Sequence, residues 1–156
     1  MGAPIVTGLH WIKENPPYWD KHKAAIIGAA PAGTFAQAFP SEIGTLLSGQ
    51  WWRVERNREV AGYGWMDVNW GDAEILLCTH PGVRRTGIGS FILEQLENEA
   101  LEQGVNYIYN VVNADHPERE ELTRWLTARS FSGSEDGKLL RAVCRPSQRP
   151  PAPQLA

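Results

Sequence analysis

The sequence predicts a mixed α/β (α+β) fold in which a mostly antiparallel sheet is flanked by helices. Two observations predict it. From residue 51 onward, short segments rich in β-branched and aromatic residues alternate with polar turns and helical patterns, as expected for strands joined by hairpins and helices. Within this order, residues 73–103 run from an apolar strand through a Gly-rich loop into an amphipathic helix, a unit that we expect at the centre of the fold.

Length and composition favour one domain. A chain of 156 residues with 42% apolar residues and seven Trp can bury one sizeable core. We expect a single domain over residues 1–145, followed by a Pro-rich tail over residues 146–156 that is predicted to be disordered. The sequence shows no internal repeat.

The elements before the Gly-rich loop follow from local patterns. After a loose start, residues 18–27 and 41–47 are predicted helices, the second with Ser41 as N-cap before Glu42. Residues 28–39 are rich in Ala, Gly and Pro and are predicted to be irregular. Two antiparallel strands, 51–55 and 60–70, flank a polar turn at Asn57-Arg58, and residues 73–79 form the next strand.

The second half continues with helices and strands in alternation. Residues 106–112 are predicted to form a strand, 117–129 a helix with Pro117 near its first turn, and 138–144 the last strand. Between residues 88 and about 103 helical spacing separates an apolar set (Ile88, Phe91, Ile92, Leu93, Leu96, Ala100, Leu101) from polar residues that face elsewhere (Glu94, Glu97, Asn98, Glu102).

The loop between strand and helix predicts a phosphate-binding site. In Arg84-Arg85-Thr86-Gly87-Ile88-Gly89 two glycines lack Cβ atoms, so backbone amides can turn toward one anion. The helix that begins there adds its own unpaired amides and the positive end of its dipole. A Walker loop is excluded because the chain has no Gly-Lys-Ser/Thr triplet, and a dinucleotide fingerprint is excluded because its third glycine position is Ile92.

The segment around this loop resembles the GNAT acyltransferase superfamily. That family has an apolar strand, then Val-x-Pro-x-x-Arg-Gly-x-Gly-Ile-Gly, then a helix; here Thr79 stands in place of Val and Arg85 in place of the first Gly. The resemblance covers about residues 51–143, whereas the first fifty residues are divergent. The order of predicted elements is also similar to the GNAT fold.

The resemblance implies acetyl-coenzyme A as co-substrate. Amides from Arg85 to Ser90 would hold its diphosphate, and the side chain of Arg84 would add positive charge. Backbone groups near Cys78 and Thr79 would pair with the pantetheine arm. The implied site therefore comprises Cys78, Thr79, Arg84, Arg85, Thr86, Gly87, Ile88, Gly89 and Ser90.

Acyl transfer to an amine needs a base, and Glu74 is the leading candidate. The run Ala-Glu-Ile-x-x-Cys before the loop resembles the strand of GNAT histone acetyltransferases whose Glu is the general base. Strand alternation places Glu74 with Leu76 and Cys78 on one face, where a partly apolar surface would raise the pKa of the acid. The alternative is a solvated or salt-bridged Glu, with Asp67 and Asp72 as other candidate bases.

The proton donor to the departing thiolate is less defined. GNAT members place a Tyr in a Phe-Tyr-x-x-x-Gly-Phe run, and this chain has Leu126 at that position. Tyr107, Tyr109 or solvent could substitute. A covalent route through Cys78 is the weaker alternative, because no His-Cys spacing supports an activated thiol.

The remaining composition limits the function classes. A net charge of -3 argues against a nucleic-acid partner. Two cysteines and four scattered histidines show no metal-ligand spacing, so no metal is expected. No apolar stretch is long enough to cross a bilayer, and we expect a soluble cytoplasmic protein. Core positions fit Trp51, Trp65 and Trp125, whereas an acceptor cleft could use Trp11, Trp19, Trp52 and Trp70.

These observations predict an acetyl-coenzyme A-dependent N-acetyltransferase that acts by direct attack on a primary amine. The alternative is a catalytically silent acyl-coenzyme A binding or regulatory module, and a nucleic-acid-modifying acyltransferase is a third hypothesis. The partner would be an amine-bearing small molecule, peptide or protein. The sequence leaves open the acceptor's identity, the acyl chain, and whether the protein is a monomer or a homodimer.

Overall fold

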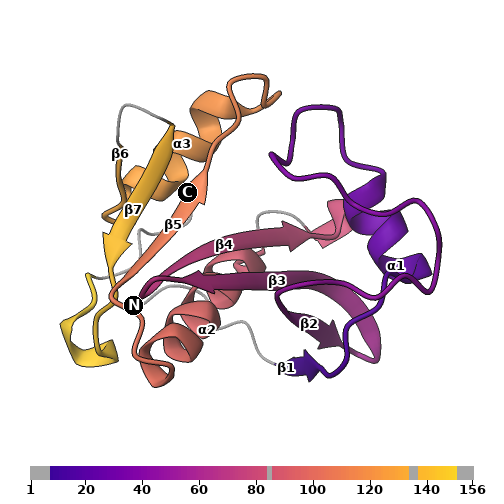
Figure 1. Ribbon diagram of the computed structural model, residues 1–156, viewed down its shortest axis with the longest axis horizontal. Helices are drawn as coiled ribbons and strands as arrows, with labels where there is room; N and C mark the ends of the chain where they lie inside the picture. The colour runs from indigo at the N-terminus through magenta and orange to yellow at the C-terminus, as the bar shows by residue number, and fades with distance from the viewer. Residues whose placement is uncertain (1–7, 84–85, 134–136, 151–156) are drawn as a thin grey trace.

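A seven-stranded mixed sheet forms the centre of the computed structural model, which describes residues 8–83, 86–133 and 137–150 (Figure 1). The strand order is β1-β2-β3-β4-β5-β7-β6, and every neighbouring pair is antiparallel except β4 and β5. This confirms the predicted α+β fold class. The strands are β1 (Leu9–Glu14), β2 (Gln50–Arg56), β3 (Glu59–Asn69), β4 (Asp72–Thr79), β5 (Tyr107–Val111), β6 (Ser132–Gly133) and β7 (Lys138–Ala142).

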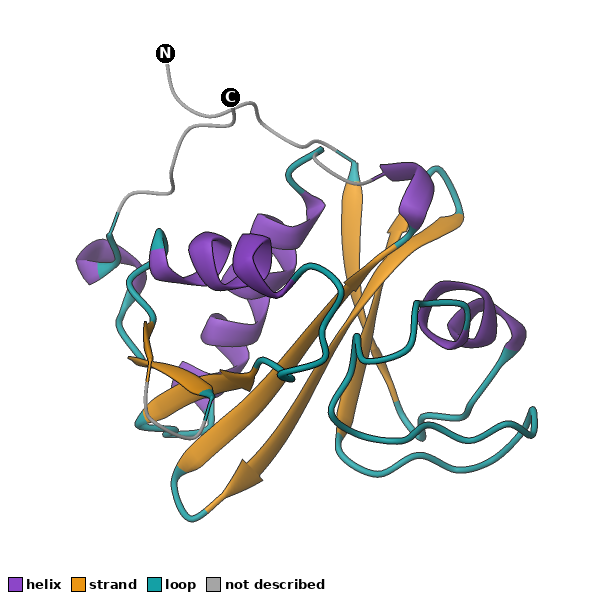
Figure 2. Cartoon of the chain, turned by 90° about the horizontal axis from the view of Figure 1, so that it is seen from above, coloured by secondary structure: helices purple, strands orange, loops and turns teal. Residues whose placement is uncertain are grey.

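Helices cover the two faces of the sheet unequally (Figure 2). One face carries α2 (Ile88–Glu102) and α3 (Arg119–Thr127). The other carries the short α1 (Lys21–Lys23), which continues as a π-helix over Ala24–Gly28, and the irregular chain that follows it. The main core lies between the sheet and α2, and a second apolar cluster lies beneath the N-terminal segment.

Most predicted strands and the helix after the Gly-rich loop are found within two residues of their expected ends. The sequence patterns that predict these elements involve residues close together in the chain, and the turn between β2 and β3 is an example. Asn57 and Arg58 both have positive φ angles, 53° and 65°, the geometry that a two-residue hairpin requires. Two strands were missed: β1, which lies in the stretch that we expected to be a loose start, and the two-residue β6.

The predicted helix over residues 41–47 is wrong. Gly44 N donates to Trp19 O at 2.7 Å, Trp19 N to Thr45 O at 2.8 Å, and Leu47 N to Pro17 O at 3.0 Å. These bonds hold the segment in a short extended pairing, which commits the amides that a helix would use. Because of the same pairing, the first helix, which was predicted to begin at residue 18, begins at Lys21. There the Asp20 carboxylate accepts a hydrogen bond from the Lys23 amide and caps the helix.

The tryptophans that were expected to line an acceptor cleft lie elsewhere. Trp19 and Trp52 are 2% and 1% exposed and belong to the two cores, while Trp70 lies fully exposed in the turn between β3 and β4. None of the three lines an acceptor cleft. Trp11 packs against the main core and stacks on Trp52 at 5.4 Å.

Glu97, predicted on a polar face, is 1% exposed. It forms ion pairs with Arg141 and with Arg149, the latter at 3.0 Å. Arg149 follows a 3-10 turn over Pro146–Gln148, so this part of the predicted disordered tail packs against α2. Residues 151–156 lie outside the described residues.

Candidate active site at the fork of the sheet

The sheet opens between its two parallel strands. β5 pairs with β4 only along Asp72–Glu74, and Figure 1 shows the two strands diverging beyond that point. A side chain bridges the beginning of the gap, where Asn110 Nδ2 donates to Ile75 O at 2.8 Å. Beyond this bridge β4 continues to Thr79 without β5 beside it.

The free edge of β4 can be assigned from its hydrogen bonds. His80 N donates to Ala61 O in β3, whereas Ile75 O accepts from the β5 side. Backbone groups of successive strand residues point to alternate edges. Leu77 and Thr79 therefore direct their N–H and C=O groups into the gap. Thr79 was expected here; Leu77 was missed, and the backbone of Cys78 faces β3.

The Gly-rich loop ends at the N-terminus of α2. Gly87 is the N-cap, with φ of 87° and no side-chain hydrogen bond to the helix. The first i to i−4 hydrogen bond of the helix runs from Phe91 N to Gly87 O. The amides of Ile88, Gly89 and Ser90 precede it in the chain, so they have no partner within the helix. The Thr86 hydroxyl donates to Val83 O at 2.5 Å. The calls on Arg84 and Arg85 lie outside the described residues.

Arg129 lies beside this helix end and was missed from the sequence. Its guanidinium donates to Ser90 Oγ and to Trp125 O, both at 3.0 Å, and stacks 3.7 Å from the centroid of the Trp125 ring. The residue is 8% exposed, and no described carboxylate forms an ion pair with it. Burial lowers the pKa of Arg129. No sequence motif marks it, because its place depends on how α3 packs on α2.

Glu74 is the last residue of β4 that pairs with β5, so it sits where the fork begins. It shares a face with Leu76 and Cys78, which belong to the second apolar cluster, as strand alternation predicted. Its carboxylate lines a cavity of about 520 Å³ between the sheet and the irregular N-terminal chain. Among the described residues it has no hydrogen-bond or ion-pair partner, which separates it from a structural salt bridge.

The surroundings of Glu74 affect its protonation. Burial, and then the charge of Asp67 directly opposite on β3, raise the pKa of Glu74, while Lys138 acts in the other direction. Tyr109 is its neighbour on β5, and burial followed by the charge of Glu74 raises the pKa of that phenol. Tyr109 therefore stays protonated at neutral pH.

Two other residues from the sequence analysis are buried. Burial raises the pKa of the Cys78 thiol to about 12, so the thiolate needed for a covalent route is scarce near neutral pH. Leu126, at the position where the family has Tyr, is fully buried in the main core. Neither residue offers a reactive group to the fork.

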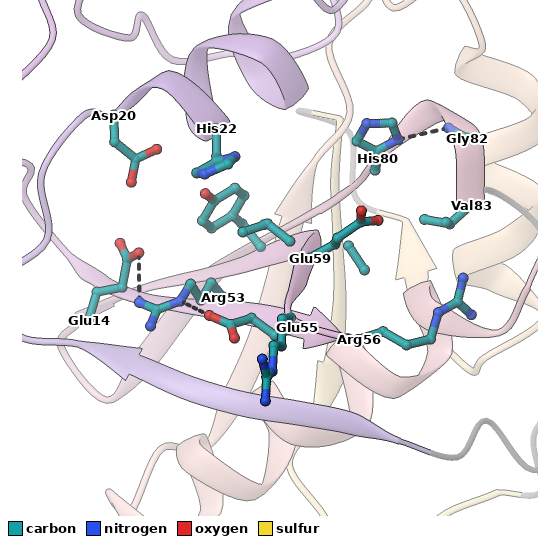
Figure 3. A pocket seen from close by; sticks show the side chains of 14 residues that line it. Glu14, Asp20, His22, Arg53, Glu55, Arg56, Glu59, His80, Gly82 and Val83 are labelled. Atoms are coloured by element: carbon teal, nitrogen blue, oxygen red, sulfur yellow. Dashed lines mark hydrogen bonds and ion pairs between the residues drawn. The ribbon is translucent and has the colours of Figure 1, made fainter.

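A larger cavity of about 660 Å³ lies on the same face but does not reach Glu74 (Figure 3). Only part of its charged lining is paired, because Arg56, Arg58 and Glu59 form no ion pair with another described residue. Arg53 pairs with Glu55 at 2.5 Å and with Glu14 at 3.5 Å. His80 accepts a hydrogen bond from Gly82 N at 3.0 Å, drawn in Figure 3. The end of this cavity around Arg53 is therefore a structural ion network, and the cavity lacks the carboxylate at the fork.

Neither a metal-binding cluster nor a membrane-spanning helix is found among the described residues. Within residues 8–83, 86–133 and 137–150, no three His, Cys, Asp or Glu side chains are grouped to bind a metal ion. In the described part of the chain, the helices are too short or too polar to span a bilayer.

The fold and site define a class of α+β protein in which a helix N-terminus with unpaired amides lies beside a forked sheet. The profile of the Acetyltransferase (GNAT) family matches residues 10–139. The chain therefore belongs to the GNAT acetyltransferase family. No curated protein matches this sequence.

Solved structures share the fold at low identity. A GNAT-family protein from Desulfovibrio desulfuricans has a TM-score of 0.52 and 15% identity, covering 62% of this chain and 71% of its own. A GNAT acetyltransferase from Staphylococcus aureus Mu50 has a TM-score of 0.48 and 16% identity, covering 62% and 68%. The PaiA N-acetyltransferase of Thermoplasma acidophilum, solved with coenzyme A, has a TM-score of 0.47 and 12% identity, covering 58% and 57%. Of these three structures, the Desulfovibrio protein is the one with a TM-score above 0.5, and at 15% identity its similarity supports the fold alone.

Proposed function

We propose that this protein transfers an acetyl group from acetyl-coenzyme A to a primary amine by direct attack in a ternary complex. Membership of the GNAT acetyltransferase family gives the reaction class. The observation that carries the proposal is the Glu74 carboxylate, which lies at the fork, lines a cavity and lacks a partner among the described residues.

Two sets of backbone groups fit the coenzyme. The amides of Ile88, Gly89 and Ser90, together with the helix dipole, suit the diphosphate. The edge groups of Leu77 and Thr79 can pair with the amides of an extended pantetheine arm as a strand would. Arg84, Arg85 and Thr86 remain proposed contributors, and Arg129 is a further cation at the same helix end.

The chain's residues then supply proton transfers. The acceptor arrives as an ammonium ion, and Glu74 removes its proton so that the nitrogen can attack the thioester carbon. A C–N bond forms, the nitrogen loses its second proton to solvent, the C–S bond breaks, and coenzyme A leaves as a thiolate. Tyr109 or solvent protonates that thiolate. The raised pKa of Cys78 supports this direct route over an acyl-enzyme.

The experiment that tests the proposal is calorimetric titration with acetyl-coenzyme A, followed by thiol release against a panel of amines. Binding with release from one acceptor supports an N-acetyltransferase. Binding without release from any acceptor would favour the second candidate, a silent acyl-coenzyme A binding module. The observation that favours that candidate is Leu126, which leaves the family's usual proton donor absent from its position.

Gly89→Val is expected to weaken acetyl-coenzyme A binding about tenfold or more, since one hydrogen bond to a charged group is worth about 1.5–3 kcal/mol. A Cβ at Gly89 would meet only Trp125, at 3.5 Å, so the helix tolerates it, while the added methyls crowd the amides. Gly87 is a poorer choice, because its φ of 87° strains any other residue. Gly133→Val, exposed and with open space around it, is the matched control. Equal affinities in both variants would contradict the site.

Arg129→Leu is expected to lower coenzyme A affinity by about tenfold or more, because a charged hydrogen bond is lost. The fold should lose little, because the desolvation cost of a buried guanidinium without a described ion-pair partner offsets the two hydrogen bonds that are lost. Arg124→Leu, at an exposed position of α3, is the control. Affinity is measured by calorimetry and stability by thermal unfolding. A lower melting temperature with unchanged affinity would show that Arg129 serves the fold only.

A further inference from the structure

The cavity that holds Glu74 has an apolar wall. We call it the acceptor cavity, and it is formed by the irregular chain at residues 36–40 and 46–48, by β2 and β3, and by the two strands of the fork. Its volume of about 520 Å³ lies in the usual range for small-molecule sites. The large side chains that line it are Phe39, Leu46, Leu47, Trp51, Trp65 and Val111.

The two indoles of this wall have no free hydrogen-bonding group. Trp51 Nε1 donates to Ser48 O at 3.0 Å, and Trp65 Nε1 donates to the same oxygen at 3.2 Å. Both N–H groups and their shared acceptor are thus engaged. Trp51 is 2% exposed and Trp65 is 8% exposed, so Trp65 offers a ligand more of the indole surface. Together with Phe39 and Leu46 it makes an apolar wall that favours contact with another flat ring.

The ionisable lining of the cavity is acidic. Glu74 is the only ionisable residue in the described lining, and Asp67 lies opposite it across the strand pair. A cation, Lys138 of β7, lies outside the lining, opposite Val111, with its ammonium 4.5 Å from the centroid of the Tyr109 ring. An ammonium group would find a carboxylate there. A carboxylate on the same ligand would be removed from water next to apolar side chains and acidic groups, with no cation in the lining to compensate it.

We propose that the acceptor is a primary amine attached to an aromatic or similarly bulky apolar group and bearing no carboxylate. The ring packs against the indole wall, and the amine reaches Glu74 at the fork. The structure therefore disfavours free amino acids and polyamines as acceptors. This inference rests on the proposed function for its chemistry, but the binding preference can be measured without turnover.

Four probes test each part of the inference. 2-Phenylethylamine carries the ring and the amine, phenylalanine adds a carboxylate, ethylamine removes the ring, and spermidine replaces the ring by further charges. Quenching of tryptophan fluorescence, with coenzyme A present, measures binding, because Trp51 and Trp65 line the cavity. We expect 2-phenylethylamine to bind at least about tenfold more tightly than each of the others.

Turnover is followed separately by thiol release from acetyl-coenzyme A with the same four amines. If phenylalanine, ethylamine or spermidine binds as tightly as 2-phenylethylamine, the inference is overturned, whether or not acetyl transfer occurs. If 2-phenylethylamine binds best but no amine releases thiol, the inference about the cavity stands and the proposed reaction fails. The two failures are therefore distinguishable.

A variant at the cavity mouth tests the charge argument. Leu46 is 62% exposed, so replacement should not disturb folding. In Leu46→Lys the preference for 2-phenylethylamine over phenylalanine should fall by about two- to fivefold, as expected for a partly screened charge pair. Leu46→Gln is polar but uncharged and should leave that ratio unchanged. The same ratio in both variants would show that charge does not determine selection at this cavity.

Discussion

Glu74→Gln is expected to lower kcat by about 10²–10⁴-fold, the usual contribution of a general base. The amide has nearly the same shape but cannot accept the proton of the attacking ammonium group. Affinity for acetyl-coenzyme A should remain within about twofold, because Glu74 faces the acceptor cavity and is not among the groups proposed to bind the diphosphate. Steady-state thiol release and calorimetry measure the two quantities on one preparation.

The pH dependence provides a second test of the same residue. Burial and the charge of Asp67 raise the pKa of Glu74 above its ordinary value of 4.5. A base works only when deprotonated, so the rate should fall as the pH is lowered through this raised pKa. In Glu74→Gln that acidic limb should disappear from the residual activity.

Asp67→Asn is the matched control, since it removes the like charge opposite Glu74 and leaves the base in place. The pKa of Glu74 should decrease, and the acidic limb should move to lower pH with a small change in the maximal rate. If Glu74→Gln retains normal turnover while Asp67→Asn loses it, Asp67 is the base. If both variants retain normal turnover, Asp72 or a water molecule must act instead.

The sequence was sufficient where short-range patterns determine the structure. Hairpin residues such as Asn57 and Arg58, the apolar periodicity after Ile88 and the strand alternation around Glu74 all act over a few positions. These features predicted the sheet, the helix after the loop and the face on which Glu74 lies. The resemblance to GNAT proteins added the order of elements.

The features that could not be predicted depend on contacts between distant segments. The pairing of Gly44 and Thr45 with Trp19 replaces a helix that local signals favoured. Which tryptophans are buried depends on how the N-terminal chain covers the sheet. Arg129 reaches Ser90 across 39 residues of sequence, so no spacing rule would identify it. Such contacts also determine the acceptor cavity, whose wall combines the irregular chain before β2 with residues of the sheet.

Glu97 gives the largest expected effect on stability. It lies on α2 with 1% of its surface exposed, forms ion pairs with Arg141 and Arg149, and accepts a hydrogen bond from Cys144 N at 3.1 Å. One carboxylate therefore joins α2 to β7 and to the segment that follows it. No local sequence pattern distinguishes this glutamate, because its partners are more than forty residues away.

Glu97→Ala is expected to lower the free energy of unfolding by about 3–5 kcal/mol, because it leaves two largely buried guanidinium groups without their carboxylate. Urea denaturation measures this change. Glu94→Ala, at an exposed position of the same helix, is the control and should stay within about 0.5 kcal/mol of the parent protein. In Glu97→Leu combined with Arg141→Met and Arg149→Met, apolar packing replaces the ionic cluster, and we expect much of the loss to be recovered. A loss below about 1 kcal/mol in Glu97→Ala would mean that water reaches the two arginines, and that the C-terminal segment is held to α2 by other contacts.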